Sequence, residues 1–133
     1  MTIVVDSSVL IDALSDDPVH GPAAVRALEA ERRRGRILVP PVAWAEVRAL
    51  MADPGRMAAL LERADVHFDA ADRSIADLAG DLWGAYRRQG GTRTRVLPDF
   101  LIAAHAHRRG GRLLTRDRGF YRQLFRSLTV VEP

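Results

Sequence analysis

Three residue types are missing from the 133-residue sequence: cysteine, asparagine and lysine. Without cysteine, the chain forms no disulfide bond, has no thiol nucleophile and offers no thiolate ligand to zinc. Without lysine, it lacks the phosphate-binding lysine of a P-loop and the amine needed for Schiff-base chemistry. All 20 basic residues are therefore arginine. These absences exclude several classes of enzyme before any motif is considered.

Long apolar runs are absent as well. No run approaches the ~20 residues needed to span a bilayer, and the amino terminus reads Met-Thr-Ile-Val-Val-Asp, without the basic stretch of a signal peptide. We therefore expect a cytoplasmic protein with no membrane partner. Apolar residues make up 47% of the sequence and charged residues 28%, which is the balance of a folded globular protein. The length favours a single domain over residues 1–133.

Acidic and basic residues are unevenly distributed, although the net charge is only +3. Residues 1–83 hold 9 arginines and 14 acidic residues, a net charge of −5. Residues 84–126 hold 11 arginines and 2 acidic residues, a net charge of +9. The basic segment favours a polyanionic partner such as nucleic acid, although a solvated surface of ion pairs would give the same pattern.

Short β-branched runs alternate with longer stretches of helical periodicity, without internal repeats. The runs predict strands at residues 3–5, 37–39, 66–68, 113–115 and 128–131. Capping residues, apolar spacing and glycine stops predict helices at residues 7–14, 22–34, 40–51, 56–63, 72–88, 98–109 and 119–125. Strands separated by helical crossovers predict an α/β fold with a central, mainly parallel sheet of about five strands and helices on both faces. Ligands bind such a sheet outside the carboxyl ends of its strands, where the strand order reverses.

Four acidic residues are candidates for that edge. Asp6 and Asp117 come just after predicted strands, Asp99 opens a helix after Pro98, and Glu46 lies about two helical turns beyond a strand. Taken alone, each is better explained as a cap, a turn residue or an exposed helix residue. Together, carboxylates on one edge would repel one another unless a cation bound among them. Because no cysteine is present, oxygen ligands favour Mg²⁺ or Mn²⁺ over zinc.

These residues lie in segments that resemble PIN-domain ribonucleases, in particular VapC-type toxins of bacterial toxin–antitoxin pairs. The matching segments are VDSSVLID at 5–12, AEV at 45–47, LPDFLIAAHA at 97–106 and LLTRDRGF at 113–120. No one of these segments is specific, whereas the ordered set at these intervals is. The resemblance runs from about residue 2 to residue 132 and implies a three-layer PIN-like fold.

The resemblance also implies a function and a site. The implied function is Mg²⁺- or Mn²⁺-dependent cleavage of structured RNA, of the tRNA or rRNA class, which inhibits translation and growth. The implied partners are a cognate antitoxin, whose tail covers the pocket, and a second copy of the chain in a homodimer. The implied catalytic and metal-binding residues are Asp6, Glu46, Asp99 and Asp117. Polar support is implied for the hydroxyls of Ser7 or Ser8 and of Thr115.

Arginines flank the two acids of the basic segment. Their forks bind phosphate, and their planes stack on unpaired bases. The RNA-binding candidates are Arg93, Arg95, Arg112, Arg116 and Arg118. His105 lies six residues after Asp99, about 240° around the helix, which favours a packing role over general-base catalysis. Asp12, inside the first helix, is a secondary candidate for the site.

Three other functions are weaker alternatives. A haloacid-dehalogenase-like phosphatase needs a second aspartate two residues after the first, where Ser8 stands, and usually a lysine. A response-regulator receiver needs an early acidic pair and a late lysine. The third alternative is a PIN-like module that binds RNA or protein without cleaving it, against which the four acidic residues argue.

Overall fold

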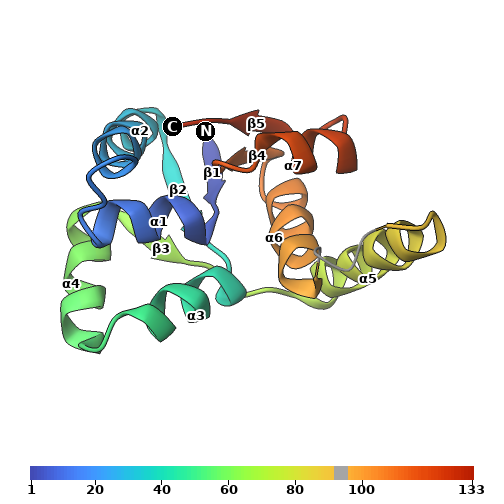
Figure 1. Cartoon of the computed structure of the whole chain (residues 1–133), viewed down its shortest axis with the longest axis horizontal. Helices are drawn as coiled ribbons and strands as arrows, with labels where there is room; N and C mark the ends of the chain where they lie inside the picture. Colours follow the sequence, from blue (N-terminus) through green and yellow to red (C-terminus); the bar gives the residue numbers. More distant parts are fainter. Residues whose placement is uncertain (92–95) are drawn as a thin grey trace.

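The computed structural model describes residues 1–91 and 96–133 (Figure 1). The RNA-binding candidates Arg93 and Arg95 lie outside the described residues. Strands and helices follow one another as β1 (Thr2–Val5), α1 (Ser7–Leu14), α2 (Gly21–Arg34), β2 (Arg36–Val39), α3 (Pro41–Leu50), α4 (Pro54–Arg63), β3 (Val66–Phe68), α5 (Arg73–Arg88), α6 (Leu97–Arg108), β4 (Arg112–Leu114), α7 (Arg118–Leu124) and β5 (Thr129–Val131). The predicted elements are all present, with ends that differ by no more than two residues.

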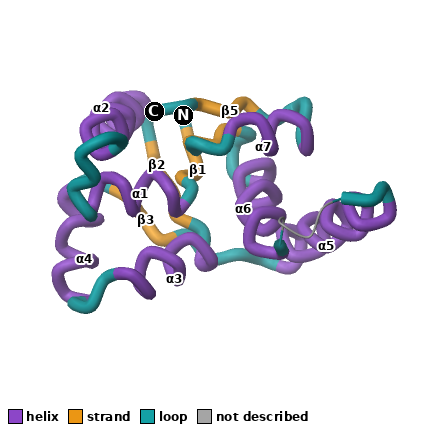
Figure 2. Tube along the Cα trace, viewed as in Figure 1, coloured by secondary structure: helices purple, strands orange, loops and turns teal. Residues whose placement is uncertain are grey.

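The five strands form one sheet in the order β3-β2-β1-β4-β5 (orange in Figure 2). Every neighbouring pair is parallel, and Val4 of β1 lies opposite Leu38 of β2 and Leu113 of β4. The predicted parallel sheet is thus confirmed and has no antiparallel member among the described residues. Its central strands are short apolar runs because a parallel sheet is covered by helices on both faces.

The helices complete a three-layer α/β arrangement. Helices α1 to α4 surround β2 and β3, on the left of Figure 1, whereas α5 to α7 lie on the side of β4 and β5. Proline occupies the first turn of α2, α3, α4 and α6, where its missing N–H leaves no helical hydrogen bond unmade. None of the described helices is long and apolar enough to cross a membrane.

Two apolar clusters hold the layers together. The larger one is built on the strands, with Ile3, Ile37 and Leu113 fully buried among the helices that cover them. A smaller one lies between α5 and α6, centred on Ile75 and Phe100. Helix α5 extends well away from the sheet in Figure 1 and packs mainly on α6. Because α6 also contacts β1 and β4, it links this outer helix to the centre of the sheet.

Candidate active site at the β1–β4 edge

The strand order reverses between β1 and β4. From β1 the chain continues to β2 on one side of the sheet, and β4 pairs with the other side of β1. Asp6 follows β1 and Thr115 follows β4, and the Asp6 N–H donates to the Leu114 carbonyl oxygen at 2.9 Å. Both residues therefore lie at the carboxyl end of the sheet, where open α/β sheets bind their ligands.

Hydroxyl groups surround the buried carboxylate of Asp6. Thr115 Oγ1 donates to Asp6 Oδ2 at 2.6 Å, and Ser8 Oγ lies 3.3 Å from the same oxygen. Thr115 Oγ1 in turn accepts the Asp117 N–H at 3.0 Å. Since Asp6 is extended and directly precedes α1, the first turn of that helix brings both serine side chains back toward it. The three predicted supporting hydroxyls are thus all next to Asp6.

Ser7 connects Asp6 to Glu46 across the sheet edge. Its Oγ lies 3.4 Å from Asp6 Oδ1 and 3.2 Å from Glu46 Oε1. One hydroxyl proton serves both carboxylates, so Ser7 donates to one of them at a time. Glu46 lies on the exposed face of α3, and its side chain reaches the site from that helix.

Asp99 occupies the first turn of α6. Its Oδ2 accepts the Val96 N–H at 3.2 Å, so it does cap the helix, as the simpler explanation of its position predicts. It also lies close enough to Asp6 and Glu46 for its charge to raise the pKa of both. Asp117, half-buried just before α7, follows Thr115 by two residues. The geometry therefore brings three of the four predicted acids into mutual electrostatic contact, with the fourth on the adjoining segment.

The charges at the site oppose ionisation. Burial raises the pKa of Asp6 despite the hydrogen bonds from Thr115 and Ser8, and Asp99 raises it further. Burial also raises the pKa of Glu46, with smaller contributions from Asp6 and Asp99. In the described part of the chain, no arginine or histidine forms an ion pair with any of these three carboxylates. Within residues 1–91 and 96–133, these carboxylates therefore have no ion pair to offset their charge.

This donor set matches a hard divalent cation in chemistry. The ligands are carboxylate and hydroxyl oxygens, and a cation among them would remove the repulsion that raises the two pKa values. As the side chains stand, no three histidine, aspartate or glutamate residues within 1–91 and 96–133 are close enough to enclose an ion. An open site of this kind is compatible with Mg²⁺, which keeps several waters and takes only one or two carboxylates from a protein.

Three of the arginines predicted to bind RNA lie within the described residues, and each of them contacts an acidic side chain. Arg112 lies at the start of β4, at the opposite edge of the sheet, where Nη1 and Nη2 donate to the buried carboxylate of Glu31 at 2.7 and 3.0 Å. The structure therefore does not bring Arg112 to the site, because its guanidinium compensates a buried charge. Arg116 contacts Asp12, and Arg118 contacts the exposed Glu132 at 2.8 Å.

Sequence reasoning missed a second set of charged contacts, on the far side of α6. His105 Nε2 lies 2.6 Å from Asp69 Oδ2, which also accepts the Arg109 Nε–H at 2.9 Å. His105 is buried, as a packing role requires, and burial lowers its pKa despite the neighbouring Asp69. The signal was available, since a polar residue within the apolar run of α6 requires a partner. This group joins α6 to the segment before α5, away from Asp6.

The chain matches a known protein family and is similar in fold to several solved structures. The family of the PIN domain matches residues 3–124. No curated protein sequence matches the chain. The fold is similar to that of VapBC2 from Rickettsia felis, solved bound to a DNA fragment from its promoter, with a TM-score of 0.78, 15% identity and coverage of 100% of this chain and 99% of that one.

Two further solved structures are similar over almost their whole length. VapBC-1 from nontypeable Haemophilus influenzae gives a TM-score of 0.73 at 18% identity, and DNA-bound VapBC from Salmonella typhimurium gives 0.71 at 19% identity. Each alignment covers 99% of this chain and 98% of the other. At these identities the likeness concerns the fold.

Proposed function

The chain belongs to the PIN domain family, and on that premise we propose that it is a metal-dependent endoribonuclease, the toxin of a toxin–antitoxin pair. We place its activity in the cytoplasm, on structured RNA of the tRNA or rRNA class, where cleavage would stop translation and growth. The observation that supports this most is Asp6, a buried carboxylate held by three hydroxyls and close to two other acids, without a cationic partner among the described residues.

The residues of the site suit hydrolysis of a phosphodiester bond. Asp6 and Asp99 would hold the cation, while Glu46 and Asp117 would complete the pocket or hold the attacking water. A bound Mg²⁺ or Mn²⁺ would stabilise charge on the phosphate and lower the pKa of that water. A carboxylate such as Glu46, whose pKa is raised, is suited to accept the proton that the water releases. The water oxygen would bond to phosphorus as the bond to the 3′ oxygen breaks, leaving a 5′-phosphate and a 3′-hydroxyl.

Exposed arginines of the basic segment would offset the negative charge of the site toward RNA. Arg118 lies directly after Asp117 and is exposed, and its ion pair with Glu132 is a surface contact that a phosphate can replace. Arg87 and Arg88 at the end of α5 and Arg122 on α7 are exposed as well. With Arg93 and Arg95, they belong to the segment of net charge +9.

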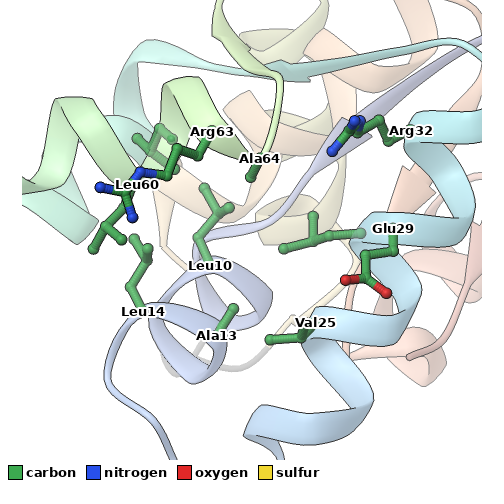
Figure 3. Close-up of a pocket in the computed structure, with 11 residues that line it drawn as sticks. Leu10, Ala13, Leu14, Val25, Glu29, Arg32, Leu60, Arg63 and Ala64 are labelled. Atoms are coloured by element: carbon green, nitrogen blue, oxygen red, sulfur yellow. The ribbon is translucent and has the colours of Figure 1, made fainter.

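An apolar groove between α1, α2 and α4 would receive part of the antitoxin (Figure 3). The cavity encloses about 220 Å³, and its lining is apolar except for three charged residues at its rim. Leu14 of α1, Val25 of α2 and Leu60 of α4 line it, one from each of the three helices (Figure 3). The similar structures are VapBC assemblies, which supports a protein partner for the chain, and the groove is the surface that we assign to it. A homodimer follows from the family resemblance.

The test of the activity is cleavage of a pool of purified tRNA and rRNA with and without Mg²⁺, mapped by sequencing of the cut ends. We expect cleavage that requires the cation, and that Asp99→Asn abolishes while the protein stays folded. A matched control is Asp77→Asn, which removes an exposed carboxylate of α5 that pairs with Arg73. If wild-type protein cleaves none of these RNAs at millimolar Mg²⁺ or Mn²⁺, the nuclease proposal is wrong.

A non-catalytic binding module is the second candidate, because no three described acids enclose an ion as they stand. It predicts RNA or protein binding that is unchanged by Asp99→Asn and by chelation of divalent cations. The nuclease predicts that chelation stops cleavage while leaving RNA bound.

The partner is tested with the product of the neighbouring gene, expected to be a short DNA-binding antitoxin. We expect it to bind at stoichiometric ratio and to inhibit cleavage. Val25→Glu should weaken binding at least tenfold, because it places a charge in the groove, whereas Val19→Glu, on an exposed valine that does not line the groove, should not. Equal binding by both variants would show that the antitoxin docks elsewhere.

A further inference from the structure

An ion pair between Asp12 and Arg116 joins the two segments that form the candidate site. Asp12 lies on α1, whose first turn supports Asp6, and Arg116 lies between β4 and α7. Arg116 Nε lies 2.6 Å from Asp12 Oδ2, and Nη2 donates to Oδ1 at 3.3 Å. The two residues are 104 positions apart in the sequence, so the contact is purely tertiary.

Asp12 depends on this arginine. The side chain of Asp12 is only 5% exposed, and its Oδ2 accepts no hydrogen bond within the part of the chain that the structure describes. The contact at 2.6 Å is therefore one of charge rather than of hydrogen-bond geometry. A buried carboxylate without a partner is strongly unfavourable. Displacing Arg116 from α1 would leave that charge uncompensated, which couples the position of the segment to α1.

The segment held in this way carries the contacts of the site. Thr115, Arg116 and Asp117 are consecutive, and each makes a different link. Thr115 Oγ1 donates to Asp6, Arg116 contacts Asp12, and the Asp117 N–H donates to Thr115 Oγ1. Thr115 and Arg116 thus anchor the segment to Asp6 and to α1, and the bond from the Asp117 N–H fixes Asp117 to the first of these anchors.

We propose that Asp12 and Arg116 are positioning residues for the nuclease reaction, holding residues 115–117 against α1 so that Thr115 and Asp117 keep their places beside Asp6. This inference rests on the proposed function. It reassigns Arg116, which the sequence suggests as an RNA contact, because its Nε and Nη2 both face Asp12. Arg118, on the other side of Asp117, forms an ion pair with the exposed Glu132 and remains an RNA-binding candidate.

The kinetic test compares Asp12→Asn with Arg116→Gln. We expect both to lower kcat by similar factors of at least about ten, with the KM for RNA within twofold of wild type. The kcat of the double variant should be no lower than that of the less active single variant, because both substitutions break the same contact. The matched control is Arg73→Gln, which breaks an exposed arginine–aspartate pair on α5 and should leave kcat unchanged. If Arg116→Gln instead raises KM and weakens its salt dependence while Asp12→Asn has no effect, Arg116 binds RNA and the proposal fails.

A second measurement needs no activity. In metal-free protein, Asp12→Asn should speed hydrogen exchange of the Asp117 amide at least about tenfold, with the amides of β1 unchanged. Should the single variants not fold, the double variant Asp12→Asn/Arg116→Gln removes both charges and is measured in the same way. If a folded variant exchanges the Asp117 amide at the same rate as wild type does, the positioning role is wrong. If the variant exchanges faster but the wild-type protein cleaves no RNA, the ion pair does anchor residues 115–117, and the nuclease proposal is wrong.

Discussion

Two buried carboxylates, Asp6 and Glu31, lie at opposite edges of the sheet and differ in whether an arginine compensates their charge. Glu31, near the end of α2, receives two hydrogen bonds from Arg112 and is fully compensated. Asp6, at the carboxyl edge, receives hydroxyl protons but no ion pair from the described residues, and two other acids lie near it. Glu31 is thus neutralised by an arginine of the fold. On the proposed function, Asp6 would instead take its cation from solution.

The largest effect is expected from Asp6→Asn. Cleavage should fall at least about 100-fold, because several kcal/mol of charge stabilisation depend on this ligand. The metal-free protein should nevertheless unfold at the same or a higher temperature than wild type, since an uncompensated buried charge is removed. Parallel assays of cleavage and thermal unfolding check both halves. A variant that loses activity only because it has become unstable would contradict the comparison.

Glu31→Gln should do the reverse. The substitution leaves the mostly buried Arg112 guanidinium without a negatively charged partner, so the free energy of unfolding should fall by about 3–5 kcal/mol. Cleavage per folded molecule should be unchanged, because Glu31 is far from Asp6. Denaturant unfolding measures the loss, with Glu29→Gln, an exposed residue of the same helix, expected within about 0.5 kcal/mol of wild type. Loss of specific activity in Glu31→Gln would show that the two edges are not independent.

A smaller change is expected from Thr115→Val, which keeps the shape of the side chain. It removes the hydrogen bond to Asp6 and leaves the Asp117 N–H without its acceptor, for a cost of about 1.5–3 kcal/mol. The matched control is Thr129→Val, at an exposed threonine of β5, which should change the free energy of unfolding by no more than about 0.5 kcal/mol. Equal unfolding free energies for the two variants would mean that the hydroxyl does not support Asp6.

The smallest effect concerns pH. The pKa of Asp6 is raised by burial, so the folded state binds this proton more tightly than the unfolded state does. Its contribution to stability is therefore complete below the ordinary pKa of 3.8 and is lost as the pH rises through the raised value. In metal-free protein, the stability of wild type relative to Asp6→Asn should decrease with rising pH across this range. A difference that is constant with pH would contradict the assigned burial of the charge.

Much of this arrangement could be predicted from the sequence, because local signals were strong. The β-branched run before Asp6 and the Pro98-Asp99 helix start placed two acids at one edge of a parallel sheet. The arginines were harder. Nothing local indicated that Arg112 would reach Glu31, 81 residues away, or that Arg116 would reach Asp12. Tertiary partners decide whether an arginine is available to RNA, and a count of charge along the chain cannot identify them.

Calorimetric titration of Mn²⁺ into the metal-free protein tests the central claim most directly. Wild type and Glu132→Gln, which lacks one exposed carboxylate, should bind Mn²⁺ alike, and Asp6→Asn should bind it at least about tenfold more weakly. Binding of Mn²⁺ by Asp6→Asn as strong as that of wild type, or no binding by wild type at millimolar Mn²⁺, would contradict the account.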